Sequence, residues 1–251
     1  MTTFFVNDTG QEGCYNESGL PITCPSIGDS LYGQDAQYIT TSPDFEVCDN
    51  SVTVDKNTNL MWQKAHNEVR VSYADAETAC AGLELAGFSD WRLPDIKETF
   101  SIADFSGTID DSSSASPSNP YVFSQYFDIA YDTNQVLSGT HTIQMMGQTW
   151  TATSRPDNMN INYFFNFLDG HLKSQFNTSP NSTLFYRCDR GDQHFTNNFT
   201  NNGDGTVSDN SKGLMWEAEN AYNTANANDQ LTRSEALEYC EKTTVAGHTD
   251  W

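Results

Sequence analysis

The sequence predicts an α+β protein made of two tandem copies of one unit, in which short helices pack on small antiparallel sheets. Two repeated segments carry this prediction. Residues 52–63 read VTVD-KNTN-LMWQ, and residues 206–217 repeat this strand, turn and strand as TVSD-NSKG-LMWE. Residues 87–94, GFSDWRLP, return in part at residues 247–251 as GHTDW. Because a helix start lies between the two segments in each copy, strand and helix patterns alternate within one unit.

Residues 1–44 are predicted to form an extension before the first copy. It begins with β-branched and aromatic residues that read as one strand with no hairpin partner beside it: Thr2, Thr3, Phe4, Phe5 and Val6. Such a strand can pair within its own domain or add to a sheet edge of a neighbouring molecule. Further along, Cys14 and Cys24 bracket a turn-rich segment that a local disulfide would close into a small loop.

Residues 45–192 are predicted to form the first complete domain. Ser72 and Asp75 are spaced as a capping box at the start of a helix. Helical spacing gives this helix a buried face of Ala76, Ala79, Cys80 and Leu83. Pro94 fits the first turn of a second helix, where its missing amide costs nothing. The buried stripe expected for that helix is Ile96, Phe100 and Ala103.

Strand patterns return in the second half of this domain. Residues 148–153, QTWTAT, read as a strand, and a further strand places Tyr163, Phe165 and Phe167 on one face. The Asp169-Gly170 pair that follows predicts a hairpin. Residues 184–191, LFYRCDRG, are expected to close the domain.

The cysteines and the repeat together predict one long-range link. Cys80 on the first helix and Cys188 on the last strand are the natural disulfide pair. Residues 193–251 would be the N-terminal half of a second domain, truncated at its own centre, with Cys240 repeating Cys80. Cys48 has no counterpart in the second copy. It is free, pairs with Cys240, or bonds to something outside this chain.

Composition excludes several classes of function. The chain has 34 acidic and 12 basic residues and a formal charge of −22. Such a field repels phosphate backbones and anionic membranes, so we expect no nucleic-acid partner. The sequence has no apolar run of membrane-spanning length and no signal-peptide pattern, so we expect no membrane insertion and a mature chain if the protein is secreted. Six cysteines without a Cys-x-x-Cys pair favour disulfides and secretion.

The repeated segments resemble the Lcl C-terminal domain family of secreted bacterial proteins. The matching residues form short motifs along the chain: Thr53–Asp55, Leu60–Lys64, Cys80–Leu83, Gly87–Pro94, Trp150–Thr153, Phe167–Gly170 and Arg187–Gly191. The resemblance covers residues 45–191 and 195–251. It implies a surface-displayed or secreted bacterial protein with two compact tandem domains, similar in plan to C-type-lectin-like folds. It brings no catalytic residues.

The chemistry-bearing residues give only one candidate metal site. Asn202, Asp204, Thr206 and Asp209 resemble part of a calcium loop, although Thr200 stands where an acid usually begins such a loop. A β-turn in which aspartate caps backbone amides explains the same residues. The histidines are scattered and no nucleophile motif is present, so we expect no enzyme activity.

The aromatic motif residues are interpreted as structural. Trp91 and Arg92 could line a ligand cleft, but an arginine between a tryptophan and a Leu-Pro helix start more often binds carboxylates or carbonyls inside a domain. The same scaffold role is expected of the other motif residues: Trp62, Asp90, Pro94, Trp150, Trp216 and Trp251. Asn-x-Ser/Thr patterns, which arise by chance in such a chain, mark five potential glycosylation sites: Asn7, Asn16, Asn177, Asn181 and Asn198.

The preferred functional hypothesis is a structural subunit of an extracellular bacterial filament or surface appendage. Tandem repeats, an orphan apolar N-terminal strand and the lack of catalytic motifs favour it. Residues 2–6 would complete a sheet in the next copy of the chain and so build a helical homopolymer. The alternative is a lectin-like adhesin that binds extracellular carbohydrate, with calcium as its candidate cofactor. Sulfated glycans suit this alternative only if a local basic patch, such as Arg187 with Arg190, outweighs the net charge.

Overall fold

The computed structural model describes residues 7–38, 40–108, 119–129, 147–192, 195–219 and 231–251. The chain divides into two compact units, residues 43–193 and residues 1–42 with 194–251. The first unit contains the segments for which the sequence predicts a domain over residues 45–192. The second groups the N-terminal extension with the partial repeat, an association that the sequence did not indicate. The predicted polymerisation strand, residues 2–6, lies outside the described residues.

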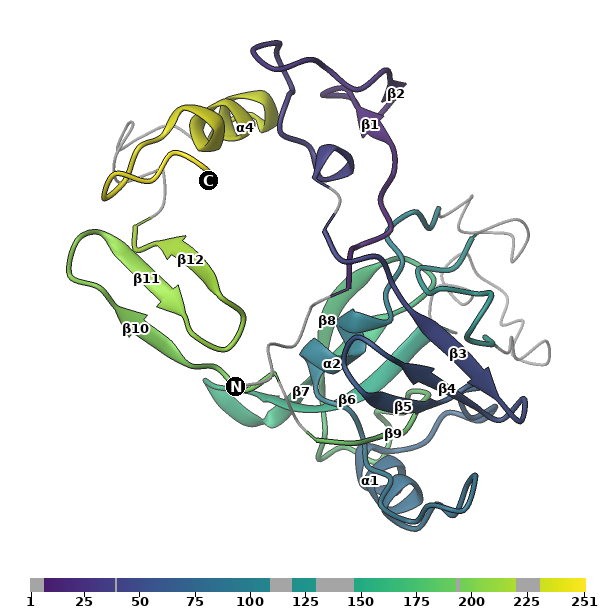
Figure 1. Cartoon of the computed structure of the whole chain (residues 1–251). Helices are drawn as coiled ribbons and strands as arrows, with labels where there is room; N and C mark the ends of the chain where they lie inside the picture. The colour runs from purple at the N-terminus through teal and green to yellow at the C-terminus, as the bar shows by residue number, and fades with distance from the viewer. Residues whose placement is uncertain (1–6, 39, 109–118, 130–146, 193–194, 220–230) are drawn as a thin grey trace. The chain divides into compact units, whose positions relative to one another are not determined.

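The 43–193 unit contains a four-stranded antiparallel sheet in the order β3 (Phe45–Cys48), β4 (Val52–Asp55), β5 (Leu60–Gln63) and β9 (Asp189–Arg190) (Figure 1). The predicted turn between β4 and β5 forms because Asp55 Oδ1 accepts the backbone N–H of Asn57 at 3.0 Å. Alternate residues of β5 are buried, with Leu60 and Trp62 both 0% exposed. This alternation turns one face of the sheet into the core.

The first helix, α1 (Tyr73–Ala81), begins as predicted. Ser72 is its N-cap, and its hydroxyl accepts the backbone N–H of Asp75 at 3.2 Å. Ala76 and Cys80 are buried, while Ala79 and Leu83 are half-buried. The helical spacing therefore identified the correct face.

The second helix, α2 (Ile96–Ser101), begins after Pro94 with Asp95 as N-cap, so Pro94 lies just before the first turn and not within it. Asp95 and Glu98 form a capping box: Asp95 Oδ1 accepts the N–H of Glu98 at 2.8 Å, and Glu98 Oε2 accepts that of Asp95 at 2.7 Å. The helix packs against two strands of another sheet, β6 (Gln148–Arg155) and β7 (Asn158–Asn166) (Figure 1).

The buried stripe predicted for α2 is wrong in two of its three positions. Ala103 is buried, but Ile96 is half-buried and Phe100 is 37% exposed. The buried residues of this helix are polar: Glu98, Thr99 and Ser101. The prediction from helical spacing considered only apolar residues. In the structure, Glu98 forms a buried ion pair with Arg92, so the face of α2 that carries Glu98 points into the domain.

A three-stranded antiparallel sheet follows, in the order β6 (Gln148–Arg155), β7 (Asn158–Asn166) and β8 (His171–Phe176). The Asp169-Gly170 hairpin is confirmed, and Gly170 supplies the positive φ of 69° that the turn requires. Phe164 and Phe165 are both buried although they point to opposite faces of β7. The sheet is thus covered on both sides near this end of β7.

A disulfide between Cys80 and Cys188 ties α1 to the start of β9, as predicted. It lies in an apolar cluster with Trp91, Trp150 and Leu184, all at most 3% exposed. Closing a loop of 108 residues contributes about 5 kcal/mol to stability in the chain-entropy model. The core of this unit therefore depends on the contact between its first helix and its last strand.

The other unit contains the second set of elements. In the extension, β1 (Cys14–Tyr15) pairs with β2 (Pro21–Ile22), the predicted Cys14–Cys24 disulfide is present, and a 3₁₀ turn covers Asp35–Gln37. The partial repeat forms a sheet in the order β10 (Phe199–Asn201), β11 (Thr206–Asp209) and β12 (Leu214–Glu217), followed by α4 (Arg233–Lys242). Thr232 caps α4 as Ser72 caps α1.

Candidate functional site

Arg92 is the centre of a buried polar cluster. Its guanidinium binds both oxygens of Glu98, with Nη2 to Oε1 at 2.6 Å and Nη1 to Oε2 at 2.7 Å. Nη1 also lies 2.9 Å from Oδ1 of Asp189, as an ion pair outside hydrogen-bond geometry. Both carboxylates are 0% exposed, whereas the Arg92 side chain is 25% exposed. Arginine suits this place because its planar fork can serve two acids at once.

The cluster contains two acids and one guanidinium, so its charges do not balance. Burial, followed by repulsion from Glu98, raises the pKa of Asp189 well above its ordinary value, and the attraction of Arg92 only partly opposes this. The cluster joins the segment after α1, helix α2 and strand β9 inside the domain. The structural interpretation of Arg92 is therefore favoured over a ligand cleft.

Arg187 is a second buried arginine, and sequence reasoning missed its role. It is 1% exposed, and its Nη1 and Nη2 donate to the carbonyl oxygens of Gln63 at 2.7 Å and Asp128 at 2.8 Å. The guanidinium also lies over the ring of Phe127 at 5.3 Å. Burial lowers the pKa of Arg187 to about 9. A basic surface patch formed by Arg187 with Arg190 is therefore excluded.

Asp90 and Arg190 form an exposed ion pair beside this core. Arg190 Nε and Nη2 donate to the two Asp90 oxygens at 2.7 and 3.0 Å, and its guanidinium stacks 3.8 Å from the centroid of Phe88. The guanidinium lowers the pKa of Asp90 through hydrogen bonding. Next to it, Trp91 is 3% exposed and donates Nε1–H to the Phe88 carbonyl at 3.2 Å. Side chains therefore alternate along the GFSDWRLP segment: Asp90 and Arg92 form ion pairs, whereas Trp91 and Leu93 are buried in the apolar core.

Three of the four predicted calcium ligands come together, and the fourth does not. Asp204 Oδ1 accepts the hydroxyl of Thr206 at 2.7 Å, and Asn202 Nδ2 donates to that same hydroxyl oxygen at 2.8 Å. Asp209 lies at the other end of β11, where its Oδ1 accepts from the Ser211 backbone and hydroxyl. Both aspartates therefore cap separate turns. Within the described residues, no group of three or more His, Cys, Asp or Glu side chains is arranged to hold a metal ion.

The family model described as the Lcl C-terminal domain matches residues 51–188, which are more than half of the sequence. The chain belongs to the Lcl C-terminal domain family. Comparison with curated proteins and with solved structures found no match. The family match covers the first of the two copies; the C-type-lectin-like plan stays a prediction.

Several residues of the motifs that resemble the Lcl C-terminal domain family are buried in the core of this domain. Trp62, Trp150 and Arg187 are among its largest fully buried side chains. The two disulfides fit a secreted protein. In the described part of the chain, no helix is long and apolar enough to cross a membrane.

The five glycosylation patterns differ in accessibility. Asn7 is only 8% exposed, and Asn16 uses its side-chain oxygen to accept the N–H groups of Ser18 and Leu20. Asn177 is half-buried, and its amide donates to a backbone carbonyl and to another asparagine. Asn181 and Asn198 are exposed. A glycan is therefore best accommodated at these last two positions.

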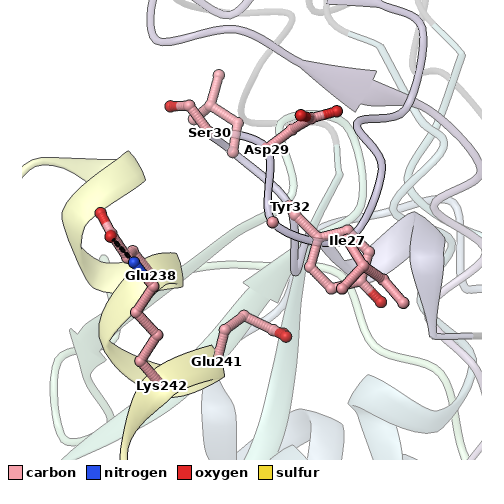
Figure 2. A pocket seen from close by; sticks show the side chains of 9 residues that line it. Ile27, Asp29, Ser30, Tyr32, Glu238, Glu241 and Lys242 are labelled. Atoms are coloured by element: carbon pink, nitrogen blue, oxygen red, sulfur yellow. Dashed lines mark hydrogen bonds and ion pairs between the residues drawn. The ribbon is translucent and has the colours of Figure 1, made fainter.

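A shallow pocket of about 420 Å³ lies between residues 27–32 and α4 in the unit that contains the partial repeat (Figure 2). Figure 2 shows Glu238 and Lys242 joined as an ion pair at its edge. Glu241, from the same helix, accepts a hydrogen bond from the Tyr38 hydroxyl, which raises the pKa of that hydroxyl. These charged groups are paired internally, so the pocket favours no particular ligand.

Two strands of the Lcl C-terminal protein expose apolar side chains along an edge. On β8, Leu172 is 47% and Phe176 is 52% exposed. On β12, Leu214 is 51% and Trp216 is 54% exposed, so the expectation that Trp216 is a core residue is wrong for the described structure. Exposed apolar strands at sheet edges are sites where other chains add strands. β8 and β12 are both edge strands of their sheets and both expose large apolar side chains.

Proposed function

We propose that this Lcl C-terminal protein is a structural subunit of an extracellular filament or surface appendage. The observation that carries the proposal is the edge strand β8, which exposes Leu172 and Phe176, together with the apolar sequence of residues 2–6. Each copy of the chain would supply the segment as a donor strand and β8 as the acceptor edge. The two disulfides support an oxidising location outside the cytoplasm.

The acceptor edge has the features that strand addition needs. Within the described residues, β8 pairs only with β7, so the backbone groups of its other edge face outward. Leu172 and Phe176 lie on the same face of β8, two positions to either side of the exposed Ser174. A soluble monomer usually blunts such an edge with charge or proline. The one lysine of β8, Lys173, is paired with the buried Asp169 carboxylate at 2.6 Å, so its charge is neutralised within the domain and does not by itself oppose a partner strand beside Leu172 and Phe176.

The donor segment has matching chemistry. Phe4, Phe5 and Val6 combine high strand propensity with apolar side chains, and no charged residue interrupts residues 1–7. Backbone hydrogen bonds to β8 would give affinity, while alternate side chains would cover Leu172 and Phe176. Because donor and acceptor are different surfaces of one chain, repeated addition does not close and produces a helical fibre.

A deletion of residues 1–6 tests this assembly. Residues 7–9 should be kept, because the Asp8 backbone N–H donates to the Thr41 carbonyl at 2.8 Å and belongs to the folded unit. We expect the full chain to form filaments in negative-stain micrographs and the deletion variant to elute as a folded monomer. Filaments that persist in the deletion variant would exclude the N-terminal strand as the donor.

A matched pair of substitutions tests the acceptor. Phe176→Lys places a charge on the edge strand β8, whereas Met159→Lys places one at a 68% exposed methionine of β7, the central strand of the sheet. Phe176→Lys should abolish filaments and Met159→Lys should leave them intact. If both variants still assemble, β8 is not the acceptor. Chelator-sensitive sugar binding by a monomer on a glycan array would instead favour the carbohydrate-binding alternative.

A further inference from the structure

The N-terminal extension binds the first turn of α4 through residue pairs that lie 199 to 218 positions apart in the sequence. The Arg233 guanidinium donates from Nη1 to the Tyr15 carbonyl at 3.1 Å and from Nη2 to Gln34 Oε1 at 2.6 Å. The Ser234 backbone N–H donates to Glu17 Oε1 at 2.8 Å. Hydrogen bonds from Ser234 lower the pKa of Glu17, so its carboxylate stays charged at neutral pH. An N–H in the first turn has no acceptor within its own helix, so Glu17 supplies one and places its charge at the positive end of α4.

Gln34 connects Arg233 to the interior of the extension. It is only 3% exposed, and its Oε1 accepts the N–H of Tyr15 at 2.8 Å in addition to the bond from Arg233. Its Nε2 donates to the carbonyl oxygens of Tyr15 at 3.1 Å and Leu31 at 3.0 Å. A charge-assisted hydrogen bond is strongest where its acceptor is shielded from water, as it is here. Arg233 is therefore the anchor of the contact.

The contact distinguishes α4 from its counterpart α1. In α1, Tyr73 stands at the place of Arg233, and Ala81 stands at the place of Glu241. Glu241 accepts a hydrogen bond from the Tyr38 hydroxyl of the extension. Neither residue of α1 offers the charged group that the extension binds. Ala81 is exposed, so the face that the extension recognises lies away from the core in the first repeat.

The Cys14–Cys24 disulfide closes the loop that presents Tyr15 and Glu17 to α4. Strands β1 and β2, which begin and end this loop, pair over only two residues each. A two-stranded hairpin of this length is not stable on its own in water. The disulfide therefore holds the loop in the conformation that α4 binds.

The two disulfides of the chain differ in their access to a reductant. Cys24 is exposed, whereas Cys80 and Cys188 are both 0% exposed. A thiolate must reach one of the two sulfurs to break a disulfide, so the bond that includes Cys24 is attacked first. A dithiol reductant gives two electrons and two protons to the two cysteine sulfurs and leaves as a cyclic disulfide.

We propose that the loop between Cys14 and Cys24 is a redox-controlled latch for α4 of the same chain. With the disulfide formed, the loop binds Arg233 and caps the helix. With the disulfide reduced, the loop loses its conformation and α4 is released from the extension. The first domain, whose disulfide is buried, stays closed under the same conditions.

Hydrogen exchange of the Ser234 amide in the full chain tests this latch, because that amide is bonded to Glu17 and not within its helix. A mild dithiol treatment is adjusted until alkylation and mass spectrometry show new labels at Cys14 and Cys24 but none at Cys80 and Cys188. Exchange at Ser234 should then become about tenfold faster than in the oxidised protein. Exchange in β11 of the same unit should stay unchanged.

Two variants separate the latch from its redox control. In the oxidised protein, Arg233→Ala should speed exchange at Ser234 by a similar factor, and reduction should add little to it. The matched control is Lys242→Ala, which removes an exposed ion pair with Glu238 at the other end of α4 and should leave this exchange unchanged. Unchanged exchange in Arg233→Ala, or in the natural chain after reduction, would overturn the proposal. So would a loss of protection across β11 on reduction, because the disulfide would then hold the whole unit.

Discussion

Arg92 and Asp189 are joined through both their backbones and their side chains. The N–H of each residue donates to the carbonyl of the other, at 2.8 and 3.0 Å, and the guanidinium lies 2.9 Å from the carboxylate. This isolated antiparallel bridge connects the segment before α2 to β9, across about 100 residues of sequence. The arginine therefore works as a fork inside the Lcl C-terminal domain.

Replacing Arg92 should be strongly destabilising. Arg92→Ala leaves the carboxyl groups of Glu98 and Asp189 buried without their cation, and removal of one partner from a buried ion pair typically costs about 3–5 kcal/mol. Arg92→Lys retains the charge but cannot bind both Glu98 oxygens, so an intermediate loss is expected. Urea unfolding followed by circular dichroism measures these differences.

The matched control is Arg190→Ala, which breaks an ion pair to the exposed Asp90. Its effect should be much smaller than that of Arg92→Ala, because an exposed pair is screened by water. Equal losses for the two arginines would contradict the central role assigned to Arg92.

Asp189→Asn should change how stability depends on pH. The native pKa of Asp189 is raised, so the native state holds a proton that the unfolded state releases from about pH 4 upward. The contribution of Asp189 to stability is therefore lost as pH rises from that value through the raised pKa. The variant lacks this loss, so its free energy of unfolding should increase relative to the natural protein as pH rises. A pH-independent difference between the two would show that Asp189 has an ordinary pKa.

The two disulfides should differ in strength. In the chain-entropy model, removing Cys80–Cys188, with a sequence separation of 108, costs about 5 kcal/mol. Removing Cys14–Cys24, with a separation of 10, costs about 3 kcal/mol. Paired Cys→Ser variants examined by urea unfolding measure both, and each should lower only the transition of its own unit. A larger loss from the short loop would contradict the model.

Replacement by alanine should lower the free energy of unfolding strongly at Trp62 and only slightly at Trp216. Trp62→Ala opens a cavity in a closed core and should cost about 3–5 kcal/mol. Trp216→Ala removes a side chain that is 54% exposed, so its effect on the unfolding free energy should stay within about 0.5 kcal/mol. Equal losses at the two tryptophans would contradict the difference in their burial.

The sequence predicted those features of the fold that depend on a few residues at a fixed spacing. The Ser72 cap, the Asp169-Gly170 hairpin and the Cys80–Cys188 link each follow from a residue type at a definite spacing. The tandem repeat also located β11, β12 and α4 from their counterparts.

The sequence did not predict which charged residues are buried, because their burial depends on contacts with distant parts of the chain. Glu98 and Arg187 are charged residues, which are usually exposed, so spacing alone cannot place them in the core. Their burial depends on partners distant in sequence, such as Asp189 for the cluster and the Asp128 carbonyl for Arg187. The exposure of Trp216 was missed because its motif matches the one that is buried around Trp62, and a repeated motif alone does not show which residues cover it.

The Cys80–Cys188 bond also has a mechanical consequence. Tension applied along the chain across this domain would pass from α1 directly through the sulfur–sulfur bond to the strand that follows it. The 107 residues between the two cysteines, which could otherwise extend by several hundred ångströms at about 3.4 Å per residue, would stay slack. An appendage built from such units would resist stretching even after its cores had been pulled open.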